Sequence, residues 1–176
     1  MTTRPGNTAQ GPTQGSVAPR RTAVQSAALV VGIVFLVVGI AGFIPGITSD
    51  YSDLGMAGHH SSAMLLGLFQ VSVLHNVVHL LFGVAGILAA RRWSASRSYL
   101  IGGGVIYLVL WLYGLFVEKT SAANFVPLNR ADDWLHLLLG LGMVVLGLLL
   151  GRRREEHAVA GHDAQYGDWR RDSASS

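Results

Sequence analysis

The sequence contains no cysteine among its 176 residues. This absence excludes disulfides, cysteine nucleophiles, thiolate metal sites and iron–sulfur clusters. Charge is also scarce, because only 13% of the residues are Asp, Glu, Lys or Arg, which is about half of what a soluble domain carries. Apolar residues make up 51% of the chain, and 22 residues are glycine. This composition argues against an ordinary soluble globule and favours a single membrane-embedded domain.

Four stretches of the chain lack every charged residue and are long enough to cross a bilayer, which takes ~20 apolar residues. They are 24–44, 69–90, 98–117 and 134–151. A spanning segment must satisfy its own backbone hydrogen bonds in lipid, so each stretch is predicted to be a helix. We therefore expect an all-α integral membrane protein with four transmembrane helices, arranged as two tandem helical hairpins in an up-down bundle. The predicted transmembrane domain covers residues 24–151.

The two ends differ from this domain in composition. Residues 1–23 are rich in Thr, Gly, Pro and Gln, and residues 152–176 mix charges with Gly, Ala and Ser. Both ends are predicted to be disordered tails. The first apolar stretch is too long for a signal peptide and lacks a cleavage site of the A-x-A kind, so we expect it to remain as the first helix.

Basic residues predict the orientation, because Lys and Arg gather on the cytoplasmic side of a membrane. Only Lys119 and Arg130 fall in the loops 45–68 and 118–133, which are therefore predicted to face outside. Both termini and the middle loop are predicted to be cytoplasmic, in a multi-pass protein of the plasma membrane. The same clustering speaks against a nucleic-acid partner. The other basic residues near the membrane ends are Arg20, Arg21, Arg91, Arg92, Arg97, Arg152, Arg153 and Arg154.

The second and fourth stretches share the pattern [ND]-x-x-H-L-L-x-G. It covers residues 76–83 in one and 133–140 in the other, and an arginine cluster follows each stretch. The first and third stretches are both rich in glycine but match less clearly. We interpret the chain as two hairpins in the same orientation, 24–92 and 98–154, related by an axis along the membrane normal.

Polar and small residues follow one face of the second and fourth stretches at helical spacing. Because lipid disfavours His, Asn and Asp, these faces are predicted to turn inward, and the glycines are predicted to let helices approach closely. The candidate functional polar core is His75, Asn76, His79, Asp133 and His136. The candidate helix-packing positions are Gly83, Gly86, Gly140 and Gly147.

The histidines allow three interpretations. The first is structural, in which they hydrogen-bond Asn76, Asp133 or a backbone carbonyl and lock helices together. The second is a role in moving protons or ions or in binding a ligand. The third is axial ligation of a b-type haem by His79 and His136 from diagonal helices. His75 and His79 also have the i, i+4 spacing of two zinc ligands, but no third ligand is evident beyond His136 or Asp132 and Asp133.

We therefore predict no cofactor and no metal, with His79 and His136 as the candidate ligands if either is bound. Asp132 and Asp133 begin the fourth helix and are explained as capping residues; a carboxylate that orients His136 is the sharper alternative for Asp133.

Two runs of sequence carry a family resemblance. They are residues 65–83, which read LLGLFQVSVLHNVVHLLFG, and residues 123–136, which read ANFVPLNRADDWLH. Together they resemble the domain-of-unknown-function family numbered 4383, small four-helix membrane proteins common in actinobacteria. The resemblance implies an integral membrane protein without an established activity, and it supplies no functional residues. The family form at the start of the fourth helix is Asp-Asn-Trp-Leu-His, whereas this chain has Asp133 in the second position.

The sequence shows no pairing of a nucleophile with a base and no phosphate-binding loop. We therefore expect a non-enzymatic structural or accessory subunit with a histidine-bearing bundle core. Its expected surroundings are the lipid bilayer, and its expected protein partners are other membrane proteins or a second copy of the chain. The alternative is a redox protein with a b-type haem, or a proton or ion transporter, that uses His79 and His136.

Overall fold

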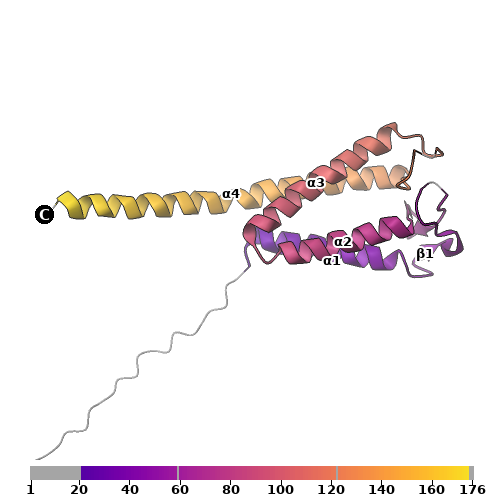
Figure 1. Cartoon of the computed structure of the whole chain (residues 1–176), viewed down its shortest axis with the longest axis horizontal. Helices are drawn as coiled ribbons and strands as arrows, with labels where there is room; N and C mark the ends of the chain where they lie inside the picture. Colours follow the sequence, from indigo (N-terminus) through magenta and orange to yellow (C-terminus); the bar gives the residue numbers. More distant parts are fainter. Residues whose placement is uncertain (1–20, 59, 122, 175–176) are drawn as a thin grey trace, which may run out of the picture.

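A computed structural model describes residues 21–58, 60–121 and 123–174, with side chains up to Arg152. Most of this part of the chain is helical. The helices are α1 (Ala23–Ala41), α2 (Val73–Ala89), α3 (Trp93–Phe116) and α4 (Arg130–Ala174), shown in Figure 1. A 3₁₀ turn, η1 (Tyr51–Asp53), and three two-residue strands lie between α1 and α2: β1 (Thr48–Ser49), β2 (Met64–Leu65) and β3 (Phe69–Gln70).

Three of these helices are long and apolar enough to cross a membrane. They are α1, α3 and the part of α4 from Arg130 to Arg152. The helix α2 is equally free of charge but has only 17 residues. It is shorter than the apolar stretch 69–90 because Ser72 caps its start: the Ser72 hydroxyl accepts a hydrogen bond from the backbone N–H of His75 at 3.2 Å. Phe69 and Gln70, which the sequence assigns to this helix, instead form β3.

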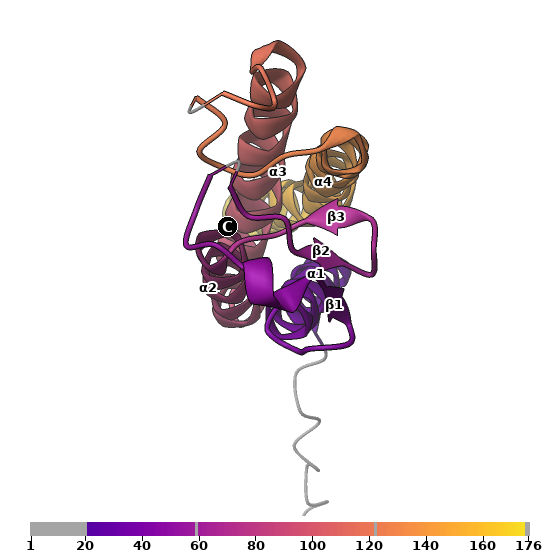
Figure 2. The ribbon, with the colours of Figure 1, turned by 90° about the vertical axis from the view of Figure 1, so that its right-hand side faces the viewer.

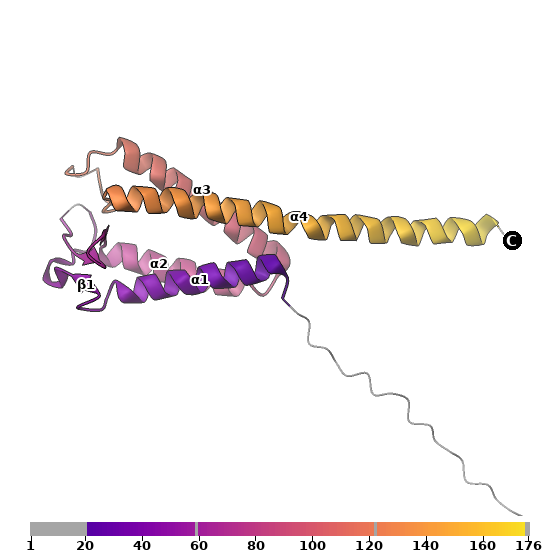
Figure 3. The same cartoon turned by 180° about the vertical axis from the view of Figure 1, so that it is seen from behind.

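The helices pack mainly as neighbours along the chain. The helix α1 lies along α2, and α3 lies along α4 (Figures 1 and 3). The buried aromatic residues of the bundle, Phe35 of α1 and Tyr107 of α3, contact each other where these two pairs meet. The remaining buried apolar residues of this core are Val24, Ala28, Ala90, Leu100 and Met143.

A small antiparallel sheet covers one end of the bundle, as Figure 2 shows. Its strand order is β1-β2-β3, with Thr48 opposite Leu65 and Leu65 opposite Phe69. A second core lies beneath it, formed by Ala63, Leu65 and Val71. The apolar run 63–69 therefore forms β2 and the start of β3, and it buries Ala63 and Leu65 in this second core.

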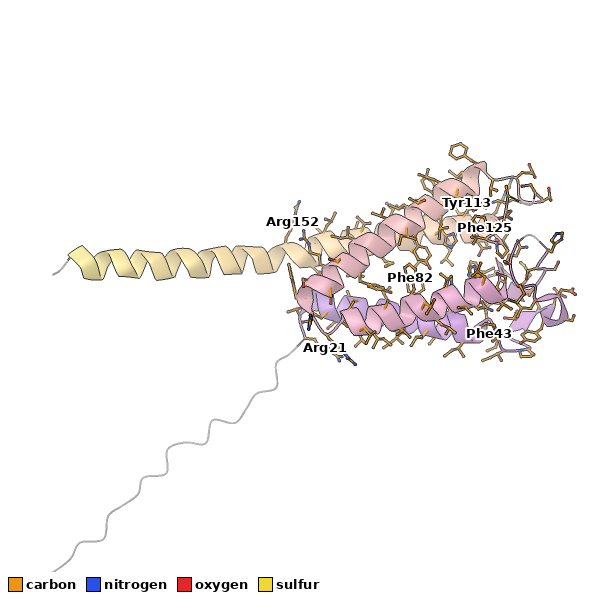
Figure 4. All side chains as sticks on the ribbon, in the orientation of Figure 1. Arg21, Phe43, Phe82, Tyr113, Phe125 and Arg152 are labelled. Carbon is orange, nitrogen blue, oxygen red and sulfur yellow. The ribbon has the colours of Figure 1, made fainter. Side chains whose placement is uncertain are left out.

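The two ends of the bundle differ in chemistry. Arg21 and Arg152 lie at one end, whereas Phe43 and Phe125 lie at the end that carries the sheet (Figure 4). The backbone of α4 continues beyond Arg152 to Ala174, so the helix runs past Gly151, the predicted edge of the transmembrane domain. The predicted N-terminal tail falls largely in residues 1–20, outside the described residues.

Candidate functional site

Glycine residues bring α1 and α2 into backbone contact. A Cβ atom on Gly83 would lie 2.7 Å from the backbone nitrogen of Leu36 and 2.8 Å from the carbonyl oxygen of Gly32. A Cβ atom on Gly86 would lie 2.8 Å from Cα of Gly32 and 2.7 Å from the Tyr99 hydroxyl. These distances are shorter than any side-chain carbon tolerates, so only glycine allows this approach.

The same arrangement recurs between α3 and α4. A Cβ atom on Gly140 would lie 3.0 Å from the carbonyl oxygen of Gly104, and one on Gly104 would lie 2.8 Å from the carbonyl oxygen of Gly140. Farther along, Gly147 faces Ile101, whose backbone nitrogen would lie 3.2 Å from an added Cβ. All four predicted packing glycines thus lie at helix–helix contacts.

The polar residue at the start of the repeated pattern packs on another glycine in both halves. The Asn76 side chain covers Gly42, just after α1, where an added Cβ would lie 2.1 Å from Asn76 Oδ1. The Asp133 side chain covers Gly114 of α3, where an added Cβ would lie 2.0 Å from Asp133 Oδ1. In each half, the missing side chain of a glycine makes the space for a buried polar group.

These contacts reveal the match between α1 and α3 that the sequence left indistinct. Gly32, Phe35 and Gly42 in the first half correspond to Gly104, Tyr107 and Gly114 in the second, at one constant spacing. The helix caps correspond as well, because Ser72 Oγ accepts from the N–H of His75 and Asn129 Oδ1 accepts from the N–H of Asp132. The repeat therefore extends over both helices of each half.

The two halves differ in the charge and in the partner of the polar residue that begins the repeated pattern, which is Asn76 in one half and Asp133 in the other. Asp133 is paired with Lys119, whose ammonium lies 3.0 and 2.8 Å from the two carboxylate oxygens and also donates to the Gly114 carbonyl at 2.7 Å. Asn76 is neutral, and among the described residues its amide nitrogen has no hydrogen-bond partner. The charged and the neutral version occupy corresponding places, so one half carries an ion pair where the other carries an amide.

The neighbouring Asp132 joins the helix α4 to the sheet. Its Oδ2 atom accepts from the backbone N–H of Gln70 at 3.1 Å and of Asn129 at 3.0 Å. The Asn129 amide donates in turn to the Leu68 carbonyl at 2.8 Å. The helix begins at Arg130 and Asn129 is its cap, so Asp132 and Asp133 are not the first residues of the helix. Asp132 completes the cap by accepting from the Asn129 N–H, and it also binds β3, which the sequence could not show.

His79 has a defined tautomer. Its Nδ1 atom lies 2.9 Å from the backbone carbonyl oxygen of His75. A carbonyl only accepts, so Nδ1 carries the proton and Nε2 is left as an acceptor in the neutral ring. The His75 ring stacks on the His79 ring, with centroids 4.3 Å apart.

A chain of aromatic contacts connects His79 to His136. The Phe35 ring lies 5.4 Å from the His79 ring, the Tyr107 ring lies 5.4 Å from Phe35, and the His136 ring lies 5.2 Å from Tyr107. In the described part of the chain, Nδ1 of His136 is buried without a hydrogen-bond partner. Asp133 is held by Lys119, and no hydrogen bond joins its carboxylate to His136 in this part of the chain.

A metal or a haem would have to be held by these same groups. Among residues 21–58, 60–121 and 123–152, no three His, Asp or Glu side chains are arranged to hold a metal ion. A haem ligated by both His79 and His136 would have to lie among the packed rings of Phe35 and Tyr107. Those two rings would therefore have to move before a macrocycle could bind.

The three histidines do line one cavity. It has a volume of about 300 Å³ and is bordered by His75, His79 and His136, by Tyr107, and by apolar residues of α2, α3 and the segment 125–127. Its polar groups are few, as is typical of pockets that bind small apolar molecules. The candidate residues Asn76 and Asp133 do not border this cavity; they support the helix contacts beside it.

The family model described as Domain of unknown function (DUF4383) matches residues 25–149. The chain belongs to this family. The match covers the four described helices except the first two residues of α1 and the part of α4 after residue 149, and it includes both copies of the histidine pattern. No curated protein and no solved structure matches the chain. The family description names no function, so a function for this DUF4383 domain has to be inferred from the arrangement of its residues.

Two participants in this site, Phe35 and Lys119, were not predicted from the sequence. Tyr107 lies on a face of small and aromatic residues that the third stretch shows in the sequence, with Gly103, Trp111 and Gly114. Phe35 was hidden because an aromatic residue in an apolar stretch carries no signal of its own, although its spacing to Gly32, which equals that of Tyr107 to Gly104, does. Lys119 served in the sequence only as one of the two basic residues of the outer loops, whereas it pairs with Asp133. Its place in the short segment between α3 and α4, close to the end of α3 and on the same side as the start of α4, is the signal that could have found it.

Proposed function

We propose that the chain is a four-span protein of the plasma membrane and that its bundle serves as a structural or accessory subunit rather than as an enzyme. One observation carries the four-span arrangement: α2 presents an apolar outer face like that of the three longer helices. Leu81 and Leu88 on α2 are 63% and 51% exposed, comparable to Val37 on α1 at 60%. Such a face suits lipid better than water.

The length of α2 is compatible with this proposal. Its 17 residues are at the lower limit of the ~17–25 residues that span a bilayer. The extended residues 69–72 before it are covered by the sheet and by Asp132, so their backbone groups are bound within the protein. The four spans then form two tandem hairpins, α1 with α2 and α3 with α4.

The orientation follows from the arginines. The segment that joins α2 to α3 carries Arg91 and Arg92, and it belongs to the same end of the bundle as Arg21 and Arg152 (Figure 4). Placing this end in the cytoplasm satisfies the preference of Arg for that side. Both termini are then cytoplasmic, and the sheet and the segment 117–129 face outside.

A structural or accessory role fits how the polar residues are used. Asp133 pairs with Lys119, Asp132 binds backbone amides, and Asn76 packs on Gly42. These groups hold elements together and face no reacting centre. We infer that the bundle presents its lipid-facing surfaces to other membrane proteins or to a second copy of the chain.

Reporter fusions test the proposal. A reporter joined after Arg97 should score as cytoplasmic, one joined after Thr120 as external, and one joined at Ser176 as cytoplasmic. An external score at Arg97 would contradict the crossing of α2. An external score at Ser176 would contradict the crossing of α4.

A second function is favoured by the cavity that His79 and His136 share. It is movement of protons or ions; redox chemistry with a b-type haem would require the Phe35 and Tyr107 rings to move first. A Soret band in the purified protein would support haem binding, and proton flux into liposomes that contain the protein would support transport.

A further inference from the structure

We propose that the cavity beside the three histidines binds a lipid-soluble ring compound with hydroxyl groups, of the quinol class. This inference rests on the proposed four-span arrangement, because that arrangement places the cavity within the outer half of the membrane. Three features of the cavity carry it: its rim, its volume and its histidine rings.

The rim of the cavity is apolar and faces lipid. Val78 of α2 and Ile106 of α3 border it, and they are 38% and 48% exposed. Figure 1 shows α3 diverging from α2 toward the end that carries the sheet. A molecule reaching the cavity between these two helices would come from the hydrocarbon region. The ligand is therefore expected to be lipid-soluble and uncharged.

The volume of the cavity suits a single ring. At about 300 Å³, it lies at the lower end of the ~300–1,000 Å³ usual for ligand sites. The rings of Tyr107 and Phe125 form part of its wall, and aromatic walls favour a flat, aromatic guest. A substituted ring with its hydrocarbon tail left between α2 and α3 meets both conditions.

The histidine rings that border the cavity favour a ligand that can form hydrogen bonds, such as one with a hydroxyl group. Nε2 of His79 is an acceptor, because Nδ1 donates to the His75 carbonyl. His136 is 3% exposed and has a buried Nδ1 without a partner in the described part of the chain. Hydrogen bonds formed away from water are worth about 0.5–1.5 kcal/mol each, so a ligand whose hydroxyl donates to Nε2 of His79 gains affinity. A ligand hydroxyl can donate to His79, and the His136 ring borders the same cavity.

Binding of a decyl-substituted benzoquinol to the full chain in lipid nanodiscs, under anaerobic conditions, tests this proposal. Empty nanodiscs are subtracted, and decylbenzene serves as the matched probe without oxygen atoms. We expect saturable binding of the quinol and weaker binding of decylbenzene. The His136→Phe variant keeps a flat ring but removes both nitrogens, and it should weaken quinol binding about 2–10-fold without changing decylbenzene binding.

A pair of adjacent variants controls for folding. Val77 and Val78 are almost equally exposed, at 39% and 38%, but only Val78 borders the cavity. Val78→Trp should fill the entrance and weaken quinol binding at least about tenfold. Val77→Trp should change quinol binding less than about twofold, which is a small fraction of the ~1.4 kcal/mol that corresponds to a tenfold change in affinity. This pair remains informative if His136→Phe does not fold.

Three results would overturn the proposal: no saturable quinol binding, equal effects of the two tryptophan variants, or decylbenzene binding as tight as that of the quinol. The last result would mean that the cavity holds an acyl chain without polar recognition. If the reporter fusions support four spans and the quinol fails to bind, only this inference fails. If the fusions contradict the four spans, the proposed function fails first.

Discussion

Phe35 of α1 and Tyr107 of α3 stack on each other, with ring centroids 5.4 Å apart and planes inclined by 25°. They are corresponding residues of the two halves, and each ring also contacts the histidine of the next helix, His79 or His136. The two copies of the repeat therefore contact each other through corresponding residues. The stacked pair joins the two helix pairs, together with the contacts of Phe82 with Tyr99 and Tyr107, and it connects the two histidines.

The Phe35–Tyr107 contact should be measurable as a coupling energy. Phe35→Leu and Tyr107→Leu each remove one ring and keep most of the volume. We expect the double variant to be less destabilised than the sum of the two single variants, by about 0.5–1.5 kcal/mol, the usual value of an aromatic pair. Unfolding in detergent measures the three variants, and strictly additive losses would contradict the stacked arrangement.

Leucine in place of the seam glycines should destabilise the bundle. Gly140→Leu and Gly83→Leu would drive a side chain into the facing backbone, at a cost of about 1–3 kcal/mol from overpacking. The matched control is Gly142→Leu, on the same helix as Gly140, because an added Cβ on Gly142 meets no atom within 4 Å. Thermal unfolding should separate the seam variants from this control; equal melting temperatures would contradict the glycine contacts.

The ion pair of Lys119 and Asp133 yields a third prediction. Lys119→Met leaves a carboxylate that is 10% exposed without its cation, and should destabilise the protein by about 1–3 kcal/mol. Asp133→Asn in the same chain restores the neutral amide that Asn76 provides in the first half. The double variant should therefore be more stable than Lys119→Met alone, and chemical unfolding of both variants checks the order. The reverse order would mean that the carboxylate is not held by Lys119.

Asp132 should contribute to the attachment of the sheet to α4. Asp132→Ala removes the acceptor of two backbone N–H groups, those of Gln70 and Asn129, and should cost about 1–2 kcal/mol. Amide exchange at Gln70 should accelerate in this variant. Asp53→Ala is the control, since Asp53 is exposed; similar exchange in both variants would contradict the link.

Sequence reasoning gave the helices and the inward polar face because both depend on local patterns: runs without charge, and His, Asn and Gly at helical spacing. It could not give the sheet, because strands of two residues such as Met64–Leu65 carry no periodicity. It extended the second helix back to Phe69 because apolarity alone does not reveal that Ser72 caps the helix. The pairing of Lys119 with Asp133 depends on how α3 and α4 approach, which is a property of tertiary packing and not of either segment.

The crossing of α2 is the central claim, and cysteine labelling tests it most directly. The chain has no cysteine, so a single exposed serine replaced by cysteine gives an unambiguous signal. Ser52→Cys lies before α2 and Ser94→Cys lies after it, both at exposed positions. In intact cells, a membrane-impermeant maleimide should label Ser52→Cys, and should label Ser94→Cys only after the membrane is permeabilised. Labelling of both variants in intact cells would place the two ends of α2 on the same side and contradict the four-span account.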